Sequence, residues 1–225
     1  MTDDACVIML VRSPEKGTVK TRLSASLDED AVLELYRCFV LDLLRTLSRG
    51  PFTVHICFHP PDSEKQIRQW LGERHAYSAQ KGNDLGERME AAFLEAFAQG
   101  FHKVLLIGSD SPDMTVELLE EALSSLNRHH AVIGPALDGG YYLIGFKAGH
   151  LLHDVFTGMD WGTPAVYEST MKAFMEHGFA VHVLPVWRDI DTCDDIRAFR
   201  HEHRETPSGR LLTLDYLREH MEIVT

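Results

Sequence analysis

The stretch Lys103-Val-Leu-Leu-Ile-Gly-Ser-Asp-Ser-Pro-Asp113 constrains the fold more than any other part of the chain. Its apolar run from Val104 to Gly108 is short and ends at glycine, which is typical of a strand buried on both faces of a parallel sheet. Asp110 therefore follows the carboxyl end of that strand, where open α/β sheets bind their ligands. A carboxylate there can hold Mg²⁺ or Mn²⁺, or it can simply cap the turn before the next helix. Its position alone leaves both hypotheses open.

Apolar runs that predict strands alternate along the chain with segments of helical periodicity. This alternation predicts an α/β fold with a mainly parallel sheet wrapped by helices. No repeat or linker interrupts it, so a single domain is expected over residues 1–225. The predicted strands are 6–11, 52–58, 104–108, 131–136, 141–146 and 179–186. The predicted helices are 30–47, 64–71, 84–98, 116–126, 164–177 and 211–221, with a further start near Thr192. The helix over 164–177 is expected to have Thr163 as N-cap and Pro164 at its first position.

Composition excludes several classes of protein. The formal net charge of −12 argues against nucleic-acid binding, which needs a basic surface. The apolar runs are too short for a membrane span, and the start Met-Thr-Asp-Asp-Ala lacks the basic residues of a secretory signal, so a cytoplasmic protein is expected. The four cysteines show no paired spacing, and Cys6 and Cys57 lie in apolar runs that predict core positions. The sequence does not indicate an oligomeric state.

A basic loop follows the first predicted strand, with Arg12, Lys16, Lys20 and Arg22 inside eleven residues. In an acidic chain this cluster favours a site for a small anionic ligand, although a merely solvated surface would also explain it. Free backbone N–H groups of such a loop, together with Lys20 and Arg22, can bind a diphosphate. The loop contains neither GxxxxGK[ST] nor GxGxxG, so it is not one of those nucleotide-binding motifs.

A second polar segment, residues 80–89, combines helix-start signals with groups that suit a nucleotide. Asp84 and Glu87 predict the N-terminus of a helix, which can itself bind an anion. Asn83 offers an amide to a base or a ribose, and Arg88 offers a charge to a phosphate. Ordinary capping explains Asp84 and Glu87 fully, but it leaves Arg88 and the two glycines of the segment unexplained.

The turn Asp138-Gly-Gly140 predicts a tight bend or a close approach of the backbone to a ligand. Tyr141 and Tyr142 follow it in an extended segment and point to opposite faces, so at most one should face a site. Residues 159–164 predict a lid-like loop that carries Trp161.

Asp191 is a second carboxylate at a predicted strand-to-helix junction. The basic loop, Asp110 and Asp191 should therefore meet at one edge of the sheet. A basic loop opposite two carboxylates suits a metal–diphosphate substrate, because the cation joins phosphate oxygens to the protein and assists the leaving group. This combination favours Asp110 as a metal ligand.

Five segments together carry a family resemblance. They are Lys16-Gly-Thr-Val-Lys-Thr-Arg-Leu23, Gly82-Asn-Asp-Leu-Gly-Glu-Arg-Met89, Ile107-Gly-Ser-Asp-Ser-Pro112, Gly134-Pro-Ala-Leu-Asp-Gly-Gly-Tyr-Tyr-Leu-Ile-Gly145 and Asp189-Ile-Asp-Thr192. The chain resembles the GT-A-like nucleotide-diphospho-sugar transferase superfamily, in particular its rSAM/selenodomain-associated transferase group. The resemblance implies a GT-A fold, which is a Rossmann-like three-layer arrangement with a mixed, mainly parallel sheet and a nucleotide near the first loop.

The resemblance also implies roles for individual residues. Asp110 matches the metal-binding position of the superfamily's acidic motif, Asp191 matches the second carboxylate, and the phosphate-binding loop is matched by Arg12, Lys20, Thr21 and Arg22. Two features depart from the pattern. The acidic motif is Ser109-Asp110-Ser111 and not a full Asp-x-Asp, and the first loop lacks the Gly-x-Gly opening of the molybdopterin- and isoprenoid-pathway nucleotidylyltransferases.

The leading hypothesis is a Mg²⁺- or Mn²⁺-dependent glycosyltransferase that moves a sugar from a nucleotide diphosphate donor to a small-molecule acceptor. Asp110 and Asp191 would hold the metal, while Lys20 and Arg22 would offset developing phosphate charge. Asp138 is the candidate base that orients the acceptor, and Asp189 is its alternative. The other predicted site residues are Asn83, Asp84 and Arg88 for the nucleotide, and Gly139, Gly140, Tyr141 and Trp161 for the acceptor or sugar.

Two other functions remain open from the sequence. The first is a nucleotidylyltransferase, which joins a nucleoside triphosphate to a phosphorylated small molecule and releases pyrophosphate. The second is a nucleotide-binding module without catalysis, which the incomplete acidic motif permits.

Overall fold

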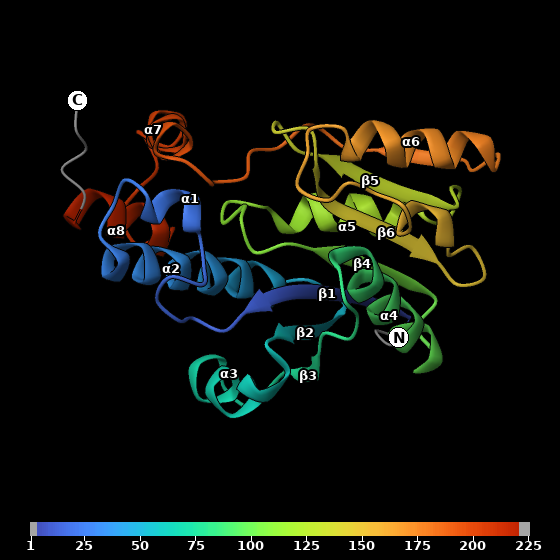
Figure 1. Cartoon of the computed structure of the whole chain (residues 1–225), viewed down its shortest axis with the longest axis horizontal. Coiled ribbons are helices and arrows are strands. Elements are labelled where there is room, and N and C mark those ends of the chain that lie inside the picture. The colour runs from blue at the N-terminus through green and yellow to red at the C-terminus, as the bar shows by residue number, and fades with distance from the viewer. Residues whose placement is uncertain (1–3, 221–225) are drawn as a thin grey trace.

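The computed structural model describes residues 4–220, which form a seven-stranded sheet flanked by helices (Figure 1). The strand order is β3-β2-β1-β4-β6-β5-β7. Only β6 runs antiparallel to its neighbours, and all other pairs are parallel. The strands are β1 (Ala5–Arg12), β2 (Thr53–His59), β3 (Ala76–Ala79), β4 (Lys103–Ile107), β5 (Ala131–Pro135), β6 (Tyr141–Lys147) and β7 (Val181–Val183). The predicted mixed, mainly parallel sheet is confirmed.

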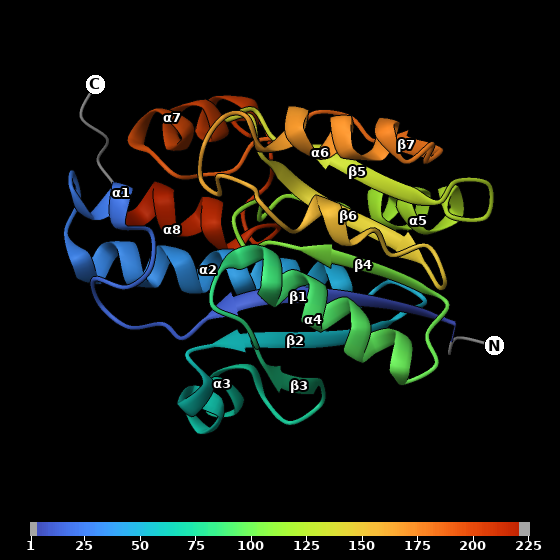
Figure 2. The same ribbon diagram turned by 45° about the vertical axis from the view of Figure 1, so that its right-hand side comes forward.

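Two layers of helices cover the two faces of the sheet, as Figure 2 shows for α2 and α4. On one face pack α2 (Glu29–Leu47), α3 (Glu64–Leu71) and α5 (Val116–Ser125), and on the other pack α4 (Leu85–Ala98) and α6 (Val166–Glu176). Along β1, Val7 and Met9 belong to the first core cluster, whereas Cys6 and Ile8 belong to the second. Burial of both faces explains why β1 is an unbroken apolar run.

A third cluster lies beyond the carboxyl end of β1, where α1, α7 and α8 gather against α2 (Figure 1). These helices are α1 (Thr21–Ser24), α7 (Cys193–Glu202) and α8 (Leu212–His220). Leu23 of α1, Phe39 of α2, Phe199 of α7 and Leu214 of α8 are all buried in this cluster. The basic loop is therefore anchored by apolar contacts with the C-terminal helices.

Asp42, a buried carboxylate on α2, caps the N-terminus of α8. Its two oxygens accept hydrogen bonds from the backbone N–H groups of Leu212 and Thr213, each at 2.8 Å. These N–H groups lie in the first turn of α8 and have no acceptor within that helix. Burial raises the pKa of Asp42, and the two backbone hydrogen bonds oppose that rise. An acidic side chain from another helix thus replaces a local N-cap.

Two expectations about the elements are corrected, and one strand had not been predicted. The last strand does not span 179–186: β7 covers only Val181–Val183, because Pro185 lacks the N–H that a ladder needs. The helix expected from Pro164 begins at Val166, and the Thr163 hydroxyl donates to the Asp160 carbonyl and does not cap it. The short strand β3 at the sheet edge was not predicted. Within residues 4–220, no helix combines the length and apolarity that crossing a membrane requires.

Replacing Asp42 by alanine should remove two charge-assisted hydrogen bonds from the N-terminus of α8. The free energy of unfolding should fall by about 2–4 kcal/mol, because hydrogen bonds to a charged group contribute about 1.5–3 kcal/mol each and partly overlap here. Urea denaturation measures the change. Asp160→Ala, at an exposed carboxylate, is the control and should change stability little. An equal effect of the two substitutions would contradict the capping role.

Candidate active site

A cavity of about 570 Å³ opens where β1, β2 and β4 end. Nine of the predicted site residues line it: Arg12, Lys20, Thr21, Arg22, Arg88, Asp110, Tyr141, Asp189 and Asp191. They come from the basic loop, the start of α4, the loop after β4, the start of β6 and the loop before α7. Parallel strands place their carboxyl ends at one edge, which is why segments so distant in sequence meet there.

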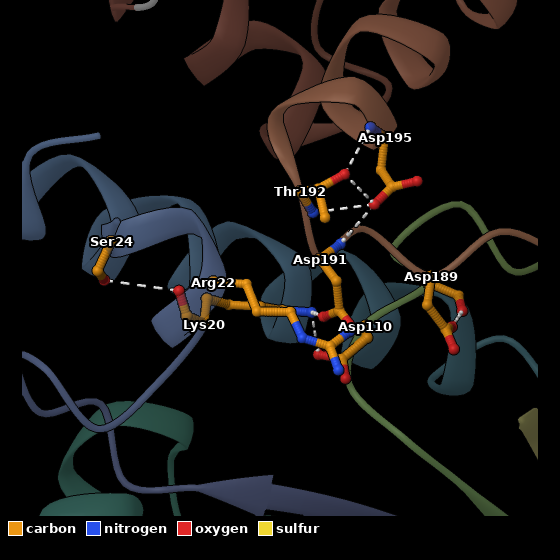
Figure 3. Close-up of polar contacts among 9 residues, drawn as sticks. Lys20, Arg22, Ser24, Asp110, Asp189, Asp191, Thr192 and Asp195 are labelled. Carbon is orange, nitrogen blue, oxygen red and sulfur yellow. Dashed lines mark hydrogen bonds and ion pairs between the residues drawn. The ribbon is translucent and has the colours of Figure 1, made fainter. Parts of the chain in front are cut away.

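At the centre of this site, the carboxylates of Asp110 and Asp191 converge on one ammonium group (Figure 3). Lys20 Nζ lies 2.5 Å from Asp110 Oδ1 and 2.9 Å from Asp191 Oδ1. Arg22 Nη1 lies 3.5 Å from the other oxygen of Asp191. The Lys20 side chain is only 4% exposed, whereas those of Asp110 and Asp191 are 41% and 31% exposed. The carboxylates therefore face the cavity while the ammonium lies beneath them.

The charge of Lys20 is maintained by this pair of carboxylates. Burial alone would lower the pKa of Lys20, but Asp110 and Asp191 together outweigh it and raise the pKa above its ordinary value. A buried cation needs such partners, because transfer of an unpaired charge from water is costly. Lys20 is therefore an ammonium ion at neutral pH.

Three hydrogen bonds join the loop after β4 to the segment before α7. The Ile190 N–H donates to the Asp110 carbonyl at 2.9 Å, and the Ser111 hydroxyl donates to Asp189 Oδ1 at 2.5 Å. The Trp187 indole N–H donates to Asp113 Oδ1 at 2.9 Å. These contacts fix the position of Asp191 relative to Asp110.

His203 supports the same junction from α7's C-terminus. Its Nε2 lies 2.9 Å from Asp113 Oδ2, and its ring packs against Phe199 with ring centroids 4.5 Å apart. The His203 ring is therefore half-buried at this junction. The sequence did not reveal this contact because its partner lies 90 positions earlier.

Asp189 is a half-buried carboxyl group next to this ion-pair cluster. The pKa of Asp189 is raised to about 7, mainly by burial and also by the negative charge of Asp110, while the hydrogen bond from Ser111 opposes the rise. In Figure 3 Asp189 is separate from the group formed by Lys20, Arg22, Asp110 and Asp191. The site thus contains three carboxyl groups, and the pKa of Asp189 is raised well above that of an ordinary aspartate.

The N-terminus of α4 provides fewer site residues than the sequence suggested. Asp84 accepts a hydrogen bond from the Glu87 N–H, and Asn83 donates both its backbone and its amide N–H to Glu87 Oε2. These are capping contacts, and neither Asn83 nor Asp84 lines the cavity. Arg88 lines it and is held by a hydrogen bond from its Nε to the Gly82 carbonyl.

Gly86 has a packing role that accounts for its place in the motif. A Cβ atom at Gly86 would lie 2.0 Å from the Phe156 carbonyl oxygen and 2.8 Å from the Trp161 ring. Only glycine allows α4 to approach the 156–161 loop this closely. One of the two glycines left unexplained by capping is thus explained by packing.

The Asp138–Gly140 turn is likewise a packing element. Asp138 Oδ1 accepts the Gly140 N–H at 2.9 Å, which closes the turn. Gly139 has a φ of 91°, and a Cβ there would lie 2.2 Å from the Pro164 carbonyl oxygen. The predicted tight turn is therefore present, and its close neighbour is the chain itself.

Of the residues predicted for the acceptor or sugar, only Tyr141 lines the cavity. Asp138, Gly139, Gly140 and Trp161 lie outside the lining residues, although the Trp161 ring contacts the Tyr141 ring edge-on at 6.5 Å between centroids. Tyr142 lines the cavity too, but it is 2% exposed and its hydroxyl donates to the Pro185 carbonyl.

The cavity also contains residues that the sequence analysis did not select. Tyr36 is buried, and its hydroxyl accepts the Arg12 N–H at 2.9 Å and donates to the Arg12 carbonyl at 3.1 Å. His59 and Gln80 line the cavity at the ends of β2 and β3. His59 follows the strand predicted over 52–58, so its position was an available signal. Gln80 follows β3, which was not predicted, and Tyr36 has the helical spacing of an ordinary core residue.

The residues present fit a hard divalent cation. The Lys20 ammonium stands in for such an ion, because both carboxylates already direct an oxygen to one cationic atom. Oxygen donors of this type suit Mg²⁺ or Mn²⁺. In the described part of the chain, no group of three or more His, Cys, Asp or Glu side chains is arranged to hold a metal. Two protein ligands leave positions for water and for oxygens of a substrate.

Comparison with known proteins shows the family to which the chain belongs. Residues 42–163 match a family described as "Uncharacterized protein conserved in bacteria (DUF2064)". The chain belongs to this family. No curated protein matches it.

Among solved structures, an inferred nucleotide-diphospho-sugar transferase from Desulfovibrio desulfuricans G20 is 41% identical to the chain. The match has a TM-score of 0.92 and covers 96% of this chain and 95% of that one. That structure shares the fold seen here. The predicted GT-A-like nucleotide-diphospho-sugar transferase superfamily and the prediction of a transferase-type enzyme are confirmed.

More distant structures share the fold alone. The 4-diphosphocytidyl-2C-methyl-D-erythritol synthase of Anaerococcus prevotii DSM 20548 is 12% identical, with a TM-score of 0.59, and the match covers 91% of this chain and 100% of that one. The inositol-1-phosphate CTP transferase of T. maritima is 14% identical, with a TM-score of 0.52, and 99% of each chain is covered.

Replacing Asp189 by asparagine should reduce the pH dependence of stability. The pKa of Asp189 is about 7 in the folded chain, against an ordinary value of 3.8, so the unfolded chain loses this proton first as the pH rises. The free energy of unfolding should therefore fall between about pH 4 and about pH 7, and Asp189→Asn should lack this part of the fall. Urea denaturation at about pH 5 and about pH 8 measures it.

The control for this experiment is Asp160→Asn, which changes an exposed carboxylate. It should keep the pH dependence of the native chain. If Asp189→Asn also kept it, the raised pKa of Asp189 would be refuted.

Proposed function

We propose that the chain is a metal-dependent glycosyltransferase that moves a sugar from a nucleotide diphosphate donor to a small-molecule acceptor. The observation that carries this proposal is the convergence of Asp110 and Asp191 on one cationic position beside the basic loop, in a single cavity. The 41% identity to a protein named for nucleotide-diphospho-sugar transfer supports the choice of donor.

In the proposed donor site, carboxylates bind the metal ion and basic side chains bind the phosphates. Asp110 and Asp191 would hold Mg²⁺ or Mn²⁺, which, when bound, would offset diphosphate charge and act as a Lewis acid for the leaving group. Arg22 is 61% exposed and only 3.5 Å from Asp191, so it can turn toward a diphosphate without losing buried packing. Arg12 and Arg88 line the same cavity and add positive charge along it.

The acceptor requires a group that can receive a proton from its hydroxyl. We prefer Asp189 to Asp138 for this role, because Asp189 lines the cavity whereas Asp138 does not. The hydrogen bond from Ser111 to Oδ1 holds the Asp189 carboxyl in one orientation and leaves Oδ2 for a substrate.

A nucleotidylyltransferase is the second candidate, and the charge of the cavity supports it. Arg12, Lys20, Arg22 and Arg88 all line the cavity, and four cations suit a triphosphate. Two of the structures that share the fold are named for CTP transfer or for a diphosphocytidyl product. This reaction would join a nucleoside triphosphate to a phosphorylated small molecule and release pyrophosphate.

A thermal-shift panel of nucleotide sugars and nucleoside triphosphates, each with and without Mn²⁺, distinguishes the two reactions. A ligand at about 100 times its Kd adds about 2.7 kcal/mol of stability. Metal-dependent stabilisation by a nucleotide sugar supports glycosyl transfer and identifies the donor. Preference for a triphosphate, with pyrophosphate released when a sugar phosphate is added, supports nucleotidyl transfer. No stabilisation by any of them would contradict both.

Asp110→Asn should lower metal-dependent turnover of the identified substrate by about 100-fold or more, because it removes one of two charged oxygen donors. Circular dichroism and the melting temperature establish that the variant folds. Asp160→Asn, at an exposed carboxylate, should leave turnover unchanged. Full metal-dependent turnover in Asp110→Asn would refute the metal assignment.

A further inference from the structure

Lys20 is held in a conformation that few lysines adopt. Its φ and ψ are 48° and 46°, and it is the one residue other than glycine with a positive φ in the part of the chain that the structure describes. Its ammonium lies over the Phe39 ring, 5.4 Å from the centroid, and its side chain is 4% exposed. A strained backbone persists only where surrounding contacts determine it, and such residues cluster at functional sites.

Lys20 is held by the same two carboxylate oxygens that a metal ion would need as ligands. Asp110 Oδ1 and Asp191 Oδ1 both lie within hydrogen-bond distance of Nζ. The two carboxylates carry two negative charges. The Lys20 ammonium offsets one of them, and Arg22, 3.5 Å from Asp191, partly offsets the other. A divalent cation placed there as well would bring four positive charges against two negative ones. The ammonium and the metal therefore exclude each other.

We propose that Lys20 is the resident counter-ion of the Asp110–Asp191 pair, which a divalent cation must displace in order to bind. The inference deepens the proposed function, on which it rests for the identity of the natural metal-bearing ligand. The displaced ammonium would stay near Arg22 at the rim of the cavity, where the two cations can receive the phosphates of that ligand. Metal binding is consequently weak without a diphosphate and strong with one, since only the diphosphate offers the displaced cation a new partner.

Binding of Mn²⁺ alone, measured by electron paramagnetic resonance of the free ion, tests this role directly. Lys20→Met keeps the apolar stem but removes the charge, so the two carboxylates lose their internal counter-ion. Mn²⁺ should then bind at least about tenfold more tightly than to the native chain. Lys16→Met is the matched control, because Lys16 lies in the same loop but is 55% exposed and pairs with Asp30. Equal or weaker Mn²⁺ binding by folded Lys20→Met would overturn the proposal.

A measurement on the native chain keeps the proposal testable if Lys20→Met fails to fold. Lysines are acylated with an amine-reactive reagent, with and without saturating Mg²⁺, and the modified peptides are quantified by mass spectrometry. Lys20 should be protected in the metal-free chain and become modified when Mg²⁺ is added, while Lys16 should be modified in both. Unchanged protection of Lys20 at saturating Mg²⁺ would overturn the proposal.

These measurements separate the inference from the proposed function. Tighter Mn²⁺ binding by Lys20→Met with no nucleotide sugar or triphosphate turned over would reject the function and keep the counter-ion role. Turnover that depends on metal, with no change in Mn²⁺ affinity in Lys20→Met, would reject the counter-ion role and keep the function.

Discussion

The ionic contact of Lys20 with Asp110 and Asp191 joins three parts of the chain that are far apart in sequence. The lysine belongs to the loop after β1, Asp110 follows β4, and Asp191 precedes α7. The Lys20 ammonium would be unfavourable here without the carboxylates, because a buried cation needs partners of opposite charge. The two neighbouring carboxylates likewise need a cation to offset their repulsion. The charges at this edge of the sheet are therefore balanced only where the three segments meet.

The Coulombic attraction within this contact and the cost of removing its charges from water are similar in size. A buried ion pair recovers its desolvation cost only with good geometry and further hydrogen bonds, so its net contribution to stability is small. Here two hydrogen bonds set the geometry independently of the ions: the Ile190 N–H donates to the Asp110 carbonyl, and the Ser111 hydroxyl donates to the Asp189 carboxylate. A preformed frame with an exchangeable ion is what a site for a charged ligand requires, since the frame does not have to be rebuilt when the ion changes.

Apolar packing between helices holds the loops of the cavity in position. Leu23 and Phe39 anchor the basic loop and α2 against α7 and α8, and Asp42 fixes the start of α8. The glycines at 86 and 139 allow the 156–164 segment to pack closely on α4 and on the turn after β5. Much of the glycine pattern that suggested ligand contact is thus used for packing between segments of the chain. The polar side chains that do face the cavity come mainly from strand ends and from the basic loop.

The sequence by itself determined the layered α/β fold and the edge of the sheet where the site lies. Apolar runs such as Cys6 to Val11 and Val104 to Gly108 require burial on both faces, and each ends at a polar junction, so Asp110 and the basic loop could be predicted together. Residues that act through distant partners could not be predicted. Tyr36 has the spacing of a core residue, and His203 lies at the C-terminal end of α7, yet each bonds to a segment far away in sequence.

Only the tertiary structure decided which predicted residues share the cavity and what lies between the two carboxylates. Asp138 and Asn83 have motif positions as suggestive as that of Lys20, but their hydrogen bonds are satisfied locally, by Gly140 and Glu87. Lys20 has no local partner of this kind, and its side chain crosses to two other loops. Pattern and periodicity describe neighbours along the chain, whereas an ion pair depends on distances that exist only after the sheet has brought its strand ends together.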